Sequence, residues 1–361
     1  MTQHRIDALR TEMNNKEFAI DAMLITTPSN RQYMSGFTGS SGVLLITLQH
    51  TWLLTDFRYM TQAPEQSKAF EIVQHAPNVL NTIADLCVKH GLKSIGFEQD
   101  FVTYGYFMEM KKVLVDTSVE LVATQGIVEA IRITKDEEEL TILREAAEIV
   151  DQTYDYILKE LRPGLREKEV AWMMEQKMRE LGATGPSFET IVASGERSAL
   201  PHGIASDRVI QSGEMVKLDF GAKYKGYCSD ITRTVAIGEV PDELQKIYEI
   251  VRDAQETTLA VLRPGMTGRE VDAIARKFIS EAGYGENFGH GTGHGLGLDI
   301  HEAPTVGPRS EQVLKPGMVV TVEPGIYLPG LGGVRIEDDV IITENGIEVI
   351  TKSPKAWTVL D

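Results

Sequence analysis

A ten-residue segment that occurs twice constrains the fold of this chain more than any other feature. Leu161–Val170 begins with Leu-Arg-Pro-Gly, and so does its echo at Leu262–Val271, 101 residues further on. In each copy one helical pattern precedes the segment and another follows it, ending at Gly182 and at Gly283. A repeat of this size seen twice predicts two similar α/β halves facing each other, because a solenoid needs at least about three units. A cleft between such halves is a natural place for a site.

The region ahead of the repeat alternates short apolar runs with helical patterns, which predicts a small α/β domain. The expected strands are Ala19–Thr26, Val43–Leu48, Trp52–Thr55, Ser94–Glu98 and Val119–Ala123. The expected helices are Asn78–His90 and Tyr104–Val115. A long helix is then expected from Thr134, the N-cap, with Glu137 as its capping-box partner, to about Leu161. We place the domains at residues 1–128 and 129–361.

The Gly- and Ser-rich segment Gly36–Gly42 lacks the spacing of a phosphate-binding loop. We interpret it as a turn between strand-forming segments and not as a nucleotide site.

Charge and cysteine content exclude several classes of protein. The net charge of −17 argues against a nucleic-acid partner, which requires a basic face. Cys87 and Cys228 form no CxxC motif or disulfide framework, so a reducing cytoplasm is expected. The N-terminus has no apolar core typical of a signal peptide, and no apolar run approaches the ~20 residues of a membrane-spanning helix.

The stretch Gly289–His301 carries three of the chain's 8 histidines, His290, His294 and His301, separated by glycines. It could be a surface loop with incidental histidines. We favour a site, because glycine allows close backbone approach and imidazole is both a ligand and a proton shuttle. Four acidic residues stand in equally unusual contexts, namely Asp219, Asp230, Glu323 and Glu337. One histidine and four carboxylates form a mixed N/O ligand set that suits a pair of divalent metals.

Asp219 and Asp230 lie on two expected strands, Met215–Gly221 and Ser229–Val235. A hairpin turn centred on Tyr224 and Lys225 would place the two aspartates directly opposite each other, with Cβ atoms about 4.5–5.5 Å apart. Two bare carboxylates at that distance repel, and one would have to hold a proton. A divalent cation between them removes the repulsion, although either aspartate alone could be a solvated edge residue.

The other acidic candidates lie in the last fifth of the chain. Glu323 ends a β-branched run and precedes Pro-Gly, which directs its charge from the edge of a core. Arg335 and Glu337 would share one face of a strand spanning residues 333–340, where Arg335 is either an orienting partner of the carboxylates or an ordinary salt bridge. Asp338 and Asp339 are expected to be turn or strand-end residues. His202 is a candidate acid or base, with a structural role as the alternative.

Taken together, these motifs resemble the metallopeptidase family of methionine aminopeptidase, Xaa-Pro aminopeptidase and Xaa-Pro dipeptidase (prolidase). The matching motifs are Leu218–Gly221, Ser229–Thr234, His290–His301, Val322–Gly325 and Arg335–Asp338. The resemblance implies a "pita-bread" catalytic domain with two pseudo-symmetric halves over about residues 130–355. The segments Tyr33–Gly39 and Thr55–Tyr59 resemble the creatinase/prolidase-type N-terminal α/β domain, which favours the proline-directed branch.

The resemblance also implies roles for the site residues. Asp219 would chelate one metal, Asp230 and Glu337 would bridge both, and His294 and Glu323 would complete the other. Glu323 would also handle protons. His202 and His301 would act on the oxyanion and the leaving nitrogen, His290 would contact substrate, and Arg335 would brace the bridging carboxylates. Manganese is the expected metal, with cobalt, zinc or iron also permitted.

The function expected is dinuclear-metal hydrolysis of the bond between an N-terminal residue and proline in short peptides. A cytoplasmic location is expected, and the resemblance implies a homodimer. Two alternatives stay open, a metal-free creatinase-type amidinohydrolase and a non-catalytic peptide-binding protein. The sequence leaves dipeptidase and aminopeptidase activity undecided.

Overall fold

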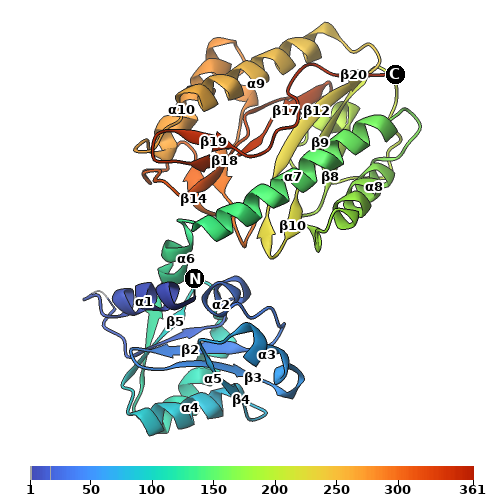
Figure 1. Ribbon diagram of the computed structural model, residues 1–361. Coiled ribbons are helices and arrows are strands. Elements are labelled where there is room, and N and C mark those ends of the chain that lie inside the picture. The colour runs from blue at the N-terminus through green and yellow to red at the C-terminus, as the bar shows by residue number, and fades with distance from the viewer. Residues whose placement is uncertain (1, 17) are drawn as a thin grey trace. The chain divides into compact units, whose positions relative to one another are not determined.

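The computed structural model describes residues 2–16 and 18–361. The chain divides into two compact units, Met1–Arg132 and Ile133–Asp361. The expected boundary at 128/129 falls inside helix α6 (Ile127–Arg132), which packs on helix α1 (Thr2–Met13) of the first unit. The connection therefore starts only where α6 ends (Figure 1). No helix within the described residues has the length and apolar character to cross a bilayer.

The first unit is an α/β domain built on one six-stranded sheet. The strand order is β4-β3-β2-β1-β5-β6, with antiparallel pairing in β1–β2–β3 and parallel pairing elsewhere. The strands are β1 (Ala22–Ile25), β2 (Val43–Thr47), β3 (Thr51–Thr55), β4 (Glu71–Gln74), β5 (Ser94–Glu98) and β6 (Glu120–Thr124). Both expected helices are present, as α4 (Val79–His90) and α5 (Tyr104–Leu114). Helix α4 begins at its N-cap Asn78 and ends at Gly91, which has φ 67°.

Sequence analysis did not identify α1, α2 (Pro28–Ser35), α3 (Gln62–Gln66) or β4. The interpretation of Gly36–Gly42 needs a correction, because Gly36 is the left-handed C-cap of α2 and the segment joins a helix to strand β2. Short 3-10 turns complete the unit, η1 (Phe57–Tyr59) and η2 (Val115–Thr117).

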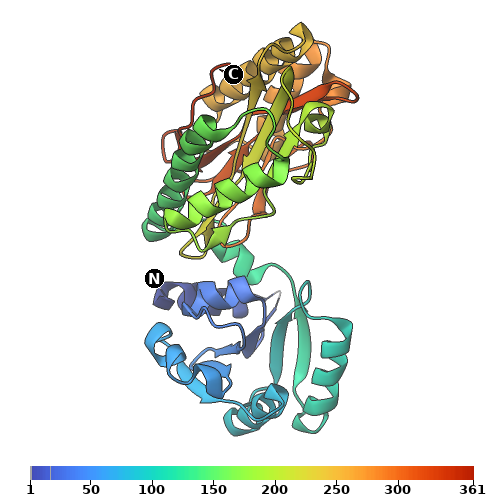
Figure 2. The ribbon, with the colours of Figure 1, turned by 90° about the vertical axis from the view of Figure 1, so that its right-hand side faces the viewer.

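The first half of the second unit packs two helices on a sheet of order β20-β12-β9-β8. The helices are α7 (Glu137–Glu160) and α8 (Glu167–Glu180), and the strands are β8 (Ile191–Ser194), β9 (Glu214–Phe220), β12 (Ile231–Ile237) and β20 (Val359–Leu360). Figure 2 shows these helices, in green, along the yellow strands. The N-cap of α7 is Asp136 with Glu139 as its capping-box partner, not Thr134 with Glu137, so the helix starts two residues later than predicted.

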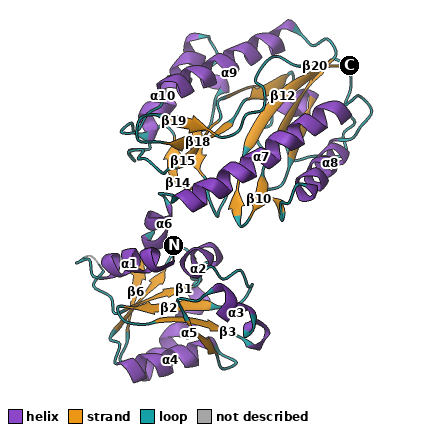
Figure 3. Ribbon diagram, viewed as in Figure 1, coloured by secondary structure: helices purple, strands orange, loops and turns teal. Residues whose placement is uncertain are grey.

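The second half repeats this arrangement with α9 (Asp242–Val261) and α10 (Gly268–Glu281). Its main sheet has the order β14-β13-β15-β18-β19. The strands are β13 (Gly293–Gly295), β14 (Glu302–Val306), β15 (Val319–Val322), β18 (Asp338–Ile342) and β19 (Ile347–Val349). Figure 3 shows the alternation of helices and strands in both units. Remaining elements are β7 (Gly185–Pro186), β10 (Ala222–Tyr224), β11 (Tyr227–Cys228), β16 (Gly325–Leu328), β17 (Gly332–Arg335), η3 (Gly195–Ala199) and η4 (Gly285–Asn287).

The sequence repeat appears as one structural motif built twice. Gly164 and Gly265 adopt positive φ, 95° and 91°, and their amides donate to the carbonyl oxygens of Ile210 and Leu314, both at 2.9 Å. In each copy the glutamate three residues into the second helix accepts the backbone N–H of the N-cap residue. The two motifs place α8 and α10, each 14 residues long, in equivalent positions.

The sheet β20-β12-β9-β8 of the second unit has one apolar face and one polar face. Val216, Leu218 and Phe220 of β9 pack into the apolar core beneath α7 and α8. The opposite face carries buried polar side chains, which are Lys217 and Asp219 of β9 and Thr232 and Thr234 of β12. Burial of so many polar groups on one face requires partners, and these partners build the site.

Candidate active site

The hairpin that carries both aspartates differs in register from the prediction. Strand β9 pairs with β12 so that Asp219 lies opposite Thr232, not opposite Asp230. The turn is centred on Lys225 and Gly226, with φ of 48° and 92°. A two-residue hairpin turn of this hand requires positive φ at both central positions, and Gly226 supplies the second at no steric cost. Asp230 lies just ahead of β12, at the end of the ladder.

Asp230 is held by its backbone. Its amide donates to Oδ2 of Asp339 (2.9 Å), and this buried acid is a partner that sequence analysis treated as a strand-end residue. A Cβ on Gly221 would lie 1.9 Å from the carbonyl oxygen of Ser229, so only glycine allows these two backbone segments of the hairpin to approach each other. The backbone contacts thus direct Asp230 toward the polar face although the ladder has ended.

The glycines around His294 allow strand β13 to lie close to its neighbours. A Cβ on Gly293 would be 2.0 Å from the Thr321 carbonyl oxygen, and one on Gly295 would be 2.4 Å from that of Ala303. The ring Nδ1–H of His294 donates to the Gly295 carbonyl (3.1 Å), which leaves Nε2 as the atom with a free lone pair. That Nε2 lies 3.6 Å from Asp230 Oδ2 and 3.6 Å from Glu323 Oε1.

The two glutamates come from the ends of strands. Glu323 follows β15, and its amide donates to the Thr292 carbonyl (2.7 Å). Glu337 lies between β17 and β18, so the single strand expected over residues 333–340 is wrong, because the chain leaves one sheet there and enters another. Glu337 Oε2 accepts from the Thr232 hydroxyl at 2.6 Å.

Arg335 braces the site through Asp219. Its guanidinium forms an ion pair with Asp219, and its Nε donates to the Thr232 hydroxyl at 3.0 Å. Thr232 in turn donates to Glu337. The arginine therefore reaches Glu337 through a threonine, and the carboxylates that it contacts directly are Asp219 and, at 3.8 Å, Glu323.

Tyr327 is a site residue that sequence analysis missed. Its hydroxyl accepts from Arg335 Nη1 (2.9 Å) and lies 2.8 Å from His290 Nε2. Because the Nδ1–H of His290 donates to the Gly291 carbonyl (2.7 Å), the tyrosine donates to Nε2. Burial lowers the pKa of His290, so the ring is a neutral acceptor. In the sequence, only the position of Tyr327 two residues after Pro-Gly indicates that it could belong to the site.

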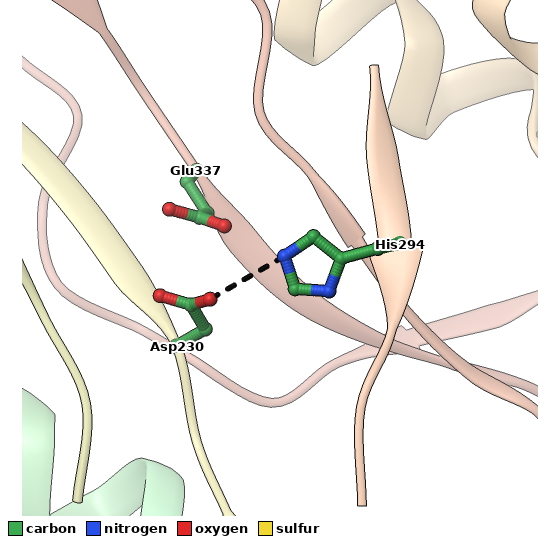
Figure 4. A group of neighbouring side chains, drawn as sticks. All are labelled: Asp230, His294 and Glu337. Atoms are coloured by element: carbon green, nitrogen blue, oxygen red, sulfur yellow. Dashed lines mark ion pairs between the residues drawn. The ribbon is translucent and has the colours of Figure 1, made fainter. Parts of the chain in front are cut away.

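Asp230, His294 and Glu337 form a compact group whose ligand atoms all lie within 4.8 Å of one another (Figure 4). Burial, and then the neighbouring carboxylates, raise the pKa of Asp230 and of Glu337 well above the ordinary range. Oδ1 of Asp230 is buried and has no hydrogen-bond partner among the described residues. Mutually repelling buried acids beside a neutral imidazole, one of them with an unpaired oxygen, fit a divalent cation.

All nine predicted site residues line one cavity of about 400 Å³ in the second unit. They are His202, Asp219, Asp230, His290, His294, His301, Glu323 and Glu337, together with Arg335 as the brace. His202 and His301 are exposed, and the rings of His301 and His294 lie 4.4 Å apart. The cavity also contains residues that sequence analysis missed, because apolar side chains carry no motif. These are Phe188, Ile191, Ile204 and Ile300, with Glu189 beside them.

Comparison with known proteins shows which protein family has this fold and cavity. Residues 141–344 match the family described as metallopeptidase family M24, and residues 5–134 match the creatinase/prolidase N-terminal domain. The chain belongs to metallopeptidase family M24, and it is a two-domain enzyme of that family with mixed α/β architecture. The predicted family and fold class are confirmed. Membership implies divalent metal ions, for which the carboxylate–imidazole group is a possible site.

Particular relatives are similar over nearly the whole chain. A structure of an Xaa-Pro dipeptidase from Bacillus anthracis is 51% identical, covers 100% of both chains and superposes with a TM-score of 0.97. An X-Pro aminopeptidase structure from Thermotoga maritima MSB8 is 40% identical, with a TM-score of 0.89, over 95% of this chain and 98% of that one. The Xaa-Pro dipeptidase of Pyrococcus horikoshii is 41% identical over 339 residues, 93% of this chain and 94% of that protein.

Proposed function

We propose that this chain is an exopeptidase that hydrolyses the bond between an N-terminal residue and a following proline in short peptides. The observation that carries the proposal is the convergence of Asp230, His294 and Glu337 in one cavity of a metallopeptidase fold. The names of the similar proteins from Bacillus anthracis and Pyrococcus horikoshii support proline as the second residue.

Asp219, Asp230, His294, Glu323 and Glu337 would hold two divalent ions, with Asp230 and Glu337 shared between them. When bound, such ions supply Lewis-acid polarisation and lower the pKa of water to near neutrality. An oxygen-rich ligand set with one imidazole permits Mn²⁺, Co²⁺, Zn²⁺ or Fe²⁺, and we propose Mn²⁺.

The chain's own groups would move protons and orient the substrate. Burial raises the pKa of Glu323, which makes this carboxylate a better proton acceptor while it remains close to His294. His202 and His301 are exposed at the cavity, so they can reach a substrate oxyanion or the leaving proline nitrogen. Half-buried His290, held by Tyr327, would also contact the substrate in the cavity.

Proline recognition would depend on the apolar part of the cavity. The tertiary amide of an Xaa-Pro bond has no N–H to donate, so the ring must be recognised by shape and apolar contact. Phe188, Ile204 and Ile300 line the cavity together with His301 and offer such a surface.

One incubation with Mn²⁺ tests the proposal. Ala-Pro, Ala-Pro-Ala and Ala-Ala-Ala are supplied separately, and the products are identified by mass spectrometry. Cleavage of Ala-Pro alone indicates a dipeptidase, cleavage of Ala-Pro-Ala an aminopeptidase, and cleavage of Ala-Ala-Ala removes the preference for proline. Activity that persists in EDTA would favour a metal-free amidinohydrolase, and binding without turnover would favour a peptide-binding protein.

We also propose that the enzyme acts in the cytoplasm as a homodimer. The two cysteines, Cys87 and Cys228, are both buried thiols, which is compatible with a reducing compartment. Light scattering of the purified protein would measure the subunit number.

A further inference from the structure

Lys217 is a completely buried lysine on the strand that carries Asp219, and the proposed chemistry does not use it. It lies in the middle of β9, two residues before Asp219, and its side chain is 0% exposed. Residues two apart in a strand share one face, so Lys217 lies on the polar face that carries the site. A lysine removed from water needs hydrogen-bond partners to be tolerated.

The partners of Lys217 are three backbone carbonyls of one short segment. Its Nζ donates to the oxygens of Leu200 (2.6 Å), Pro201 (3.2 Å) and Ser198 (3.3 Å). Burial lowers the pKa of Lys217 to about 6, but a neutral amine still donates two hydrogen bonds, so the anchor persists in either form. A single side chain of β9 thus provides hydrogen-bond donors to three backbone carbonyl groups of the segment Ser198–Pro201.

This segment directly precedes His202, whose ring makes no hydrogen bond with the described residues and is exposed. The position of the ring therefore depends on the backbone on either side of it; after the ring, Arg197 donates to the Ile204 carbonyl (2.6 Å). Two further contacts fix the same segment, because Arg335 Nη1 donates to the Pro201 carbonyl (3.1 Å) and the Gly333 amide donates to Ser198 Oγ (2.8 Å). Of the three anchors, Lys217 alone binds several carbonyls of the segment at once.

We infer that Lys217 is the positioning residue for His202. It ties the segment that carries this histidine to the same strand that carries Asp219, and so sets the distance between the histidine and the carboxylate group. The inference rests on the proposed function, in which His202 acts on the substrate. A displacement of about 1 Å in an acting group can cost about 100-fold in rate.

The test combines kinetics with a structural measurement on His202. We expect Lys217→Met to lower kcat on Ala-Pro by about 10- to 100-fold with a smaller change in KM. His202→Ala should lower kcat by about 100-fold, and the double variant should match His202→Ala to within about threefold. Lys217→Arg, which keeps N–H donors at this position, should recover most of the lost rate.

The NMR signal of the His202 ring, identified by its loss in His202→Ala, should shift in Lys217→Met without any substrate. The matched control is Lys355→Met, since Lys355 donates to Gln255 and Asp338 and contacts neither Ser198–Pro201 nor His202. It should lose folding stability but keep its kcat and its His202 signal. If Lys217→Met does not fold, Lys217→Gln, which retains an amide donor, replaces it in the same comparison.

Losses that multiply in the double variant, or an unchanged His202 signal in the Lys217 variant, would overturn the inference. If the wild-type protein cleaves no Xaa-Pro peptide, the proposed function fails, but the NMR comparison still decides whether Lys217 positions His202.

Discussion

At the scale of single residues, the site consists of acids that the protein alone does not satisfy. Asp230 combines burial, an Oδ1 atom that no described residue hydrogen-bonds and a pKa raised by burial and by Glu337. Each of these features costs folding free energy in the absence of a cation. The carboxylates therefore lower the stability of the metal-free protein while they serve the proposed metal site. Their substitution should reduce activity and increase the stability of the metal-free protein.

Asp230→Asn should abolish cleavage and stabilise the chelated protein. The amide cannot ionise, so the variant avoids the buried, unpaired charge, and its free energy of unfolding in EDTA should rise by about 1–3 kcal/mol. Urea unfolding in EDTA and a peptide assay with Mn²⁺ measure the two effects. Asp85→Asn, at an exposed position of α4, should leave both unchanged. Wild-type activity in Asp230→Asn would remove this residue from the ligand set.

The stability of the chelated protein should fall as the pH rises, relative to an Asp230→Asn/Glu337→Gln variant. The folded-state pKa values of both acids lie above their ordinary values of 3.8 and 4.5. Below those ordinary values both states are protonated and the acids contribute nothing. Above them the unfolded chain ionises first, so unfolding becomes more favourable as the pH increases from about 4 to 8. Urea unfolding of both proteins across this range measures the difference, and a constant difference would contradict the raised pKa values.

At the scale of elements, His294 is positioned by strand β13, whose glycines allow the strand to lie close to its neighbours. Strand β13 passes within contact distance of the backbone of β15 and of the Ala303 carbonyl because Gly293 and Gly295 have no Cβ. The hairpin on the other side of the cavity uses Gly221 and Gly226 in comparable ways, for a close approach and for a turn. The ligands are thus held by backbone geometry as well as by side-chain contacts.

Gly293→Ala should displace β13 and reduce both stability and activity. The new Cβ would lie 2.0 Å from the Thr321 carbonyl oxygen, and relief of such a clash requires backbone movement that costs about 1–3 kcal/mol. Gly289→Ala is the matched control in the same stretch, because its Cβ would meet nothing within 4 Å. Urea unfolding, Mn²⁺ titration and peptide cleavage compare the two. Equal effects of both substitutions would exclude the steric explanation.

The repeat, α4, α5 and the residues of the cavity could be predicted because each depends on a local pattern of caps, glycines and charged residues. The register of the hairpin was predicted wrongly, although Gly226 indicates the turn, because a two-residue hairpin turn favours glycine at its second central position. A shift of the turn by one residue changes every opposed pair. The pairing of Arg335 with Asp219, the role of Tyr327 and the apolar lining depend on contacts between distant segments, which no local pattern encodes.

At the scale of the whole molecule, each unit contains its own apolar core. The core that includes Trp52, Leu54 and Phe97 lies wholly within the first unit, and the cores beneath α7–α8 and α9–α10 lie wholly within the second. All five proposed metal ligands belong to the second unit. Binding of the metal should therefore be a property of that unit.

Residues 133–361 expressed alone should fold cooperatively and bind Mn²⁺ with an affinity near that of the full chain. An independent core is sufficient for folding of a domain of this size. Circular dichroism during urea unfolding and calorimetric Mn²⁺ titration measure the two properties. A fragment that folds but does not bind Mn²⁺ would show that the first unit contributes to the metal centre.

The sequence repeat that begins with Leu-Arg-Pro-Gly bears on how this protein evolved. Asp219 and Asp230 come from the copy that contains α7 and α8, whereas His294, Glu323 and Glu337 come from the copy that contains α9 and α10. An ancestral polypeptide with the length of one copy would have owned only a fraction of the chelating groups. It could have gathered a complete set only by associating with a sister subunit, so in such a lineage self-association would precede catalysis, and gene fusion would later make the partnership permanent.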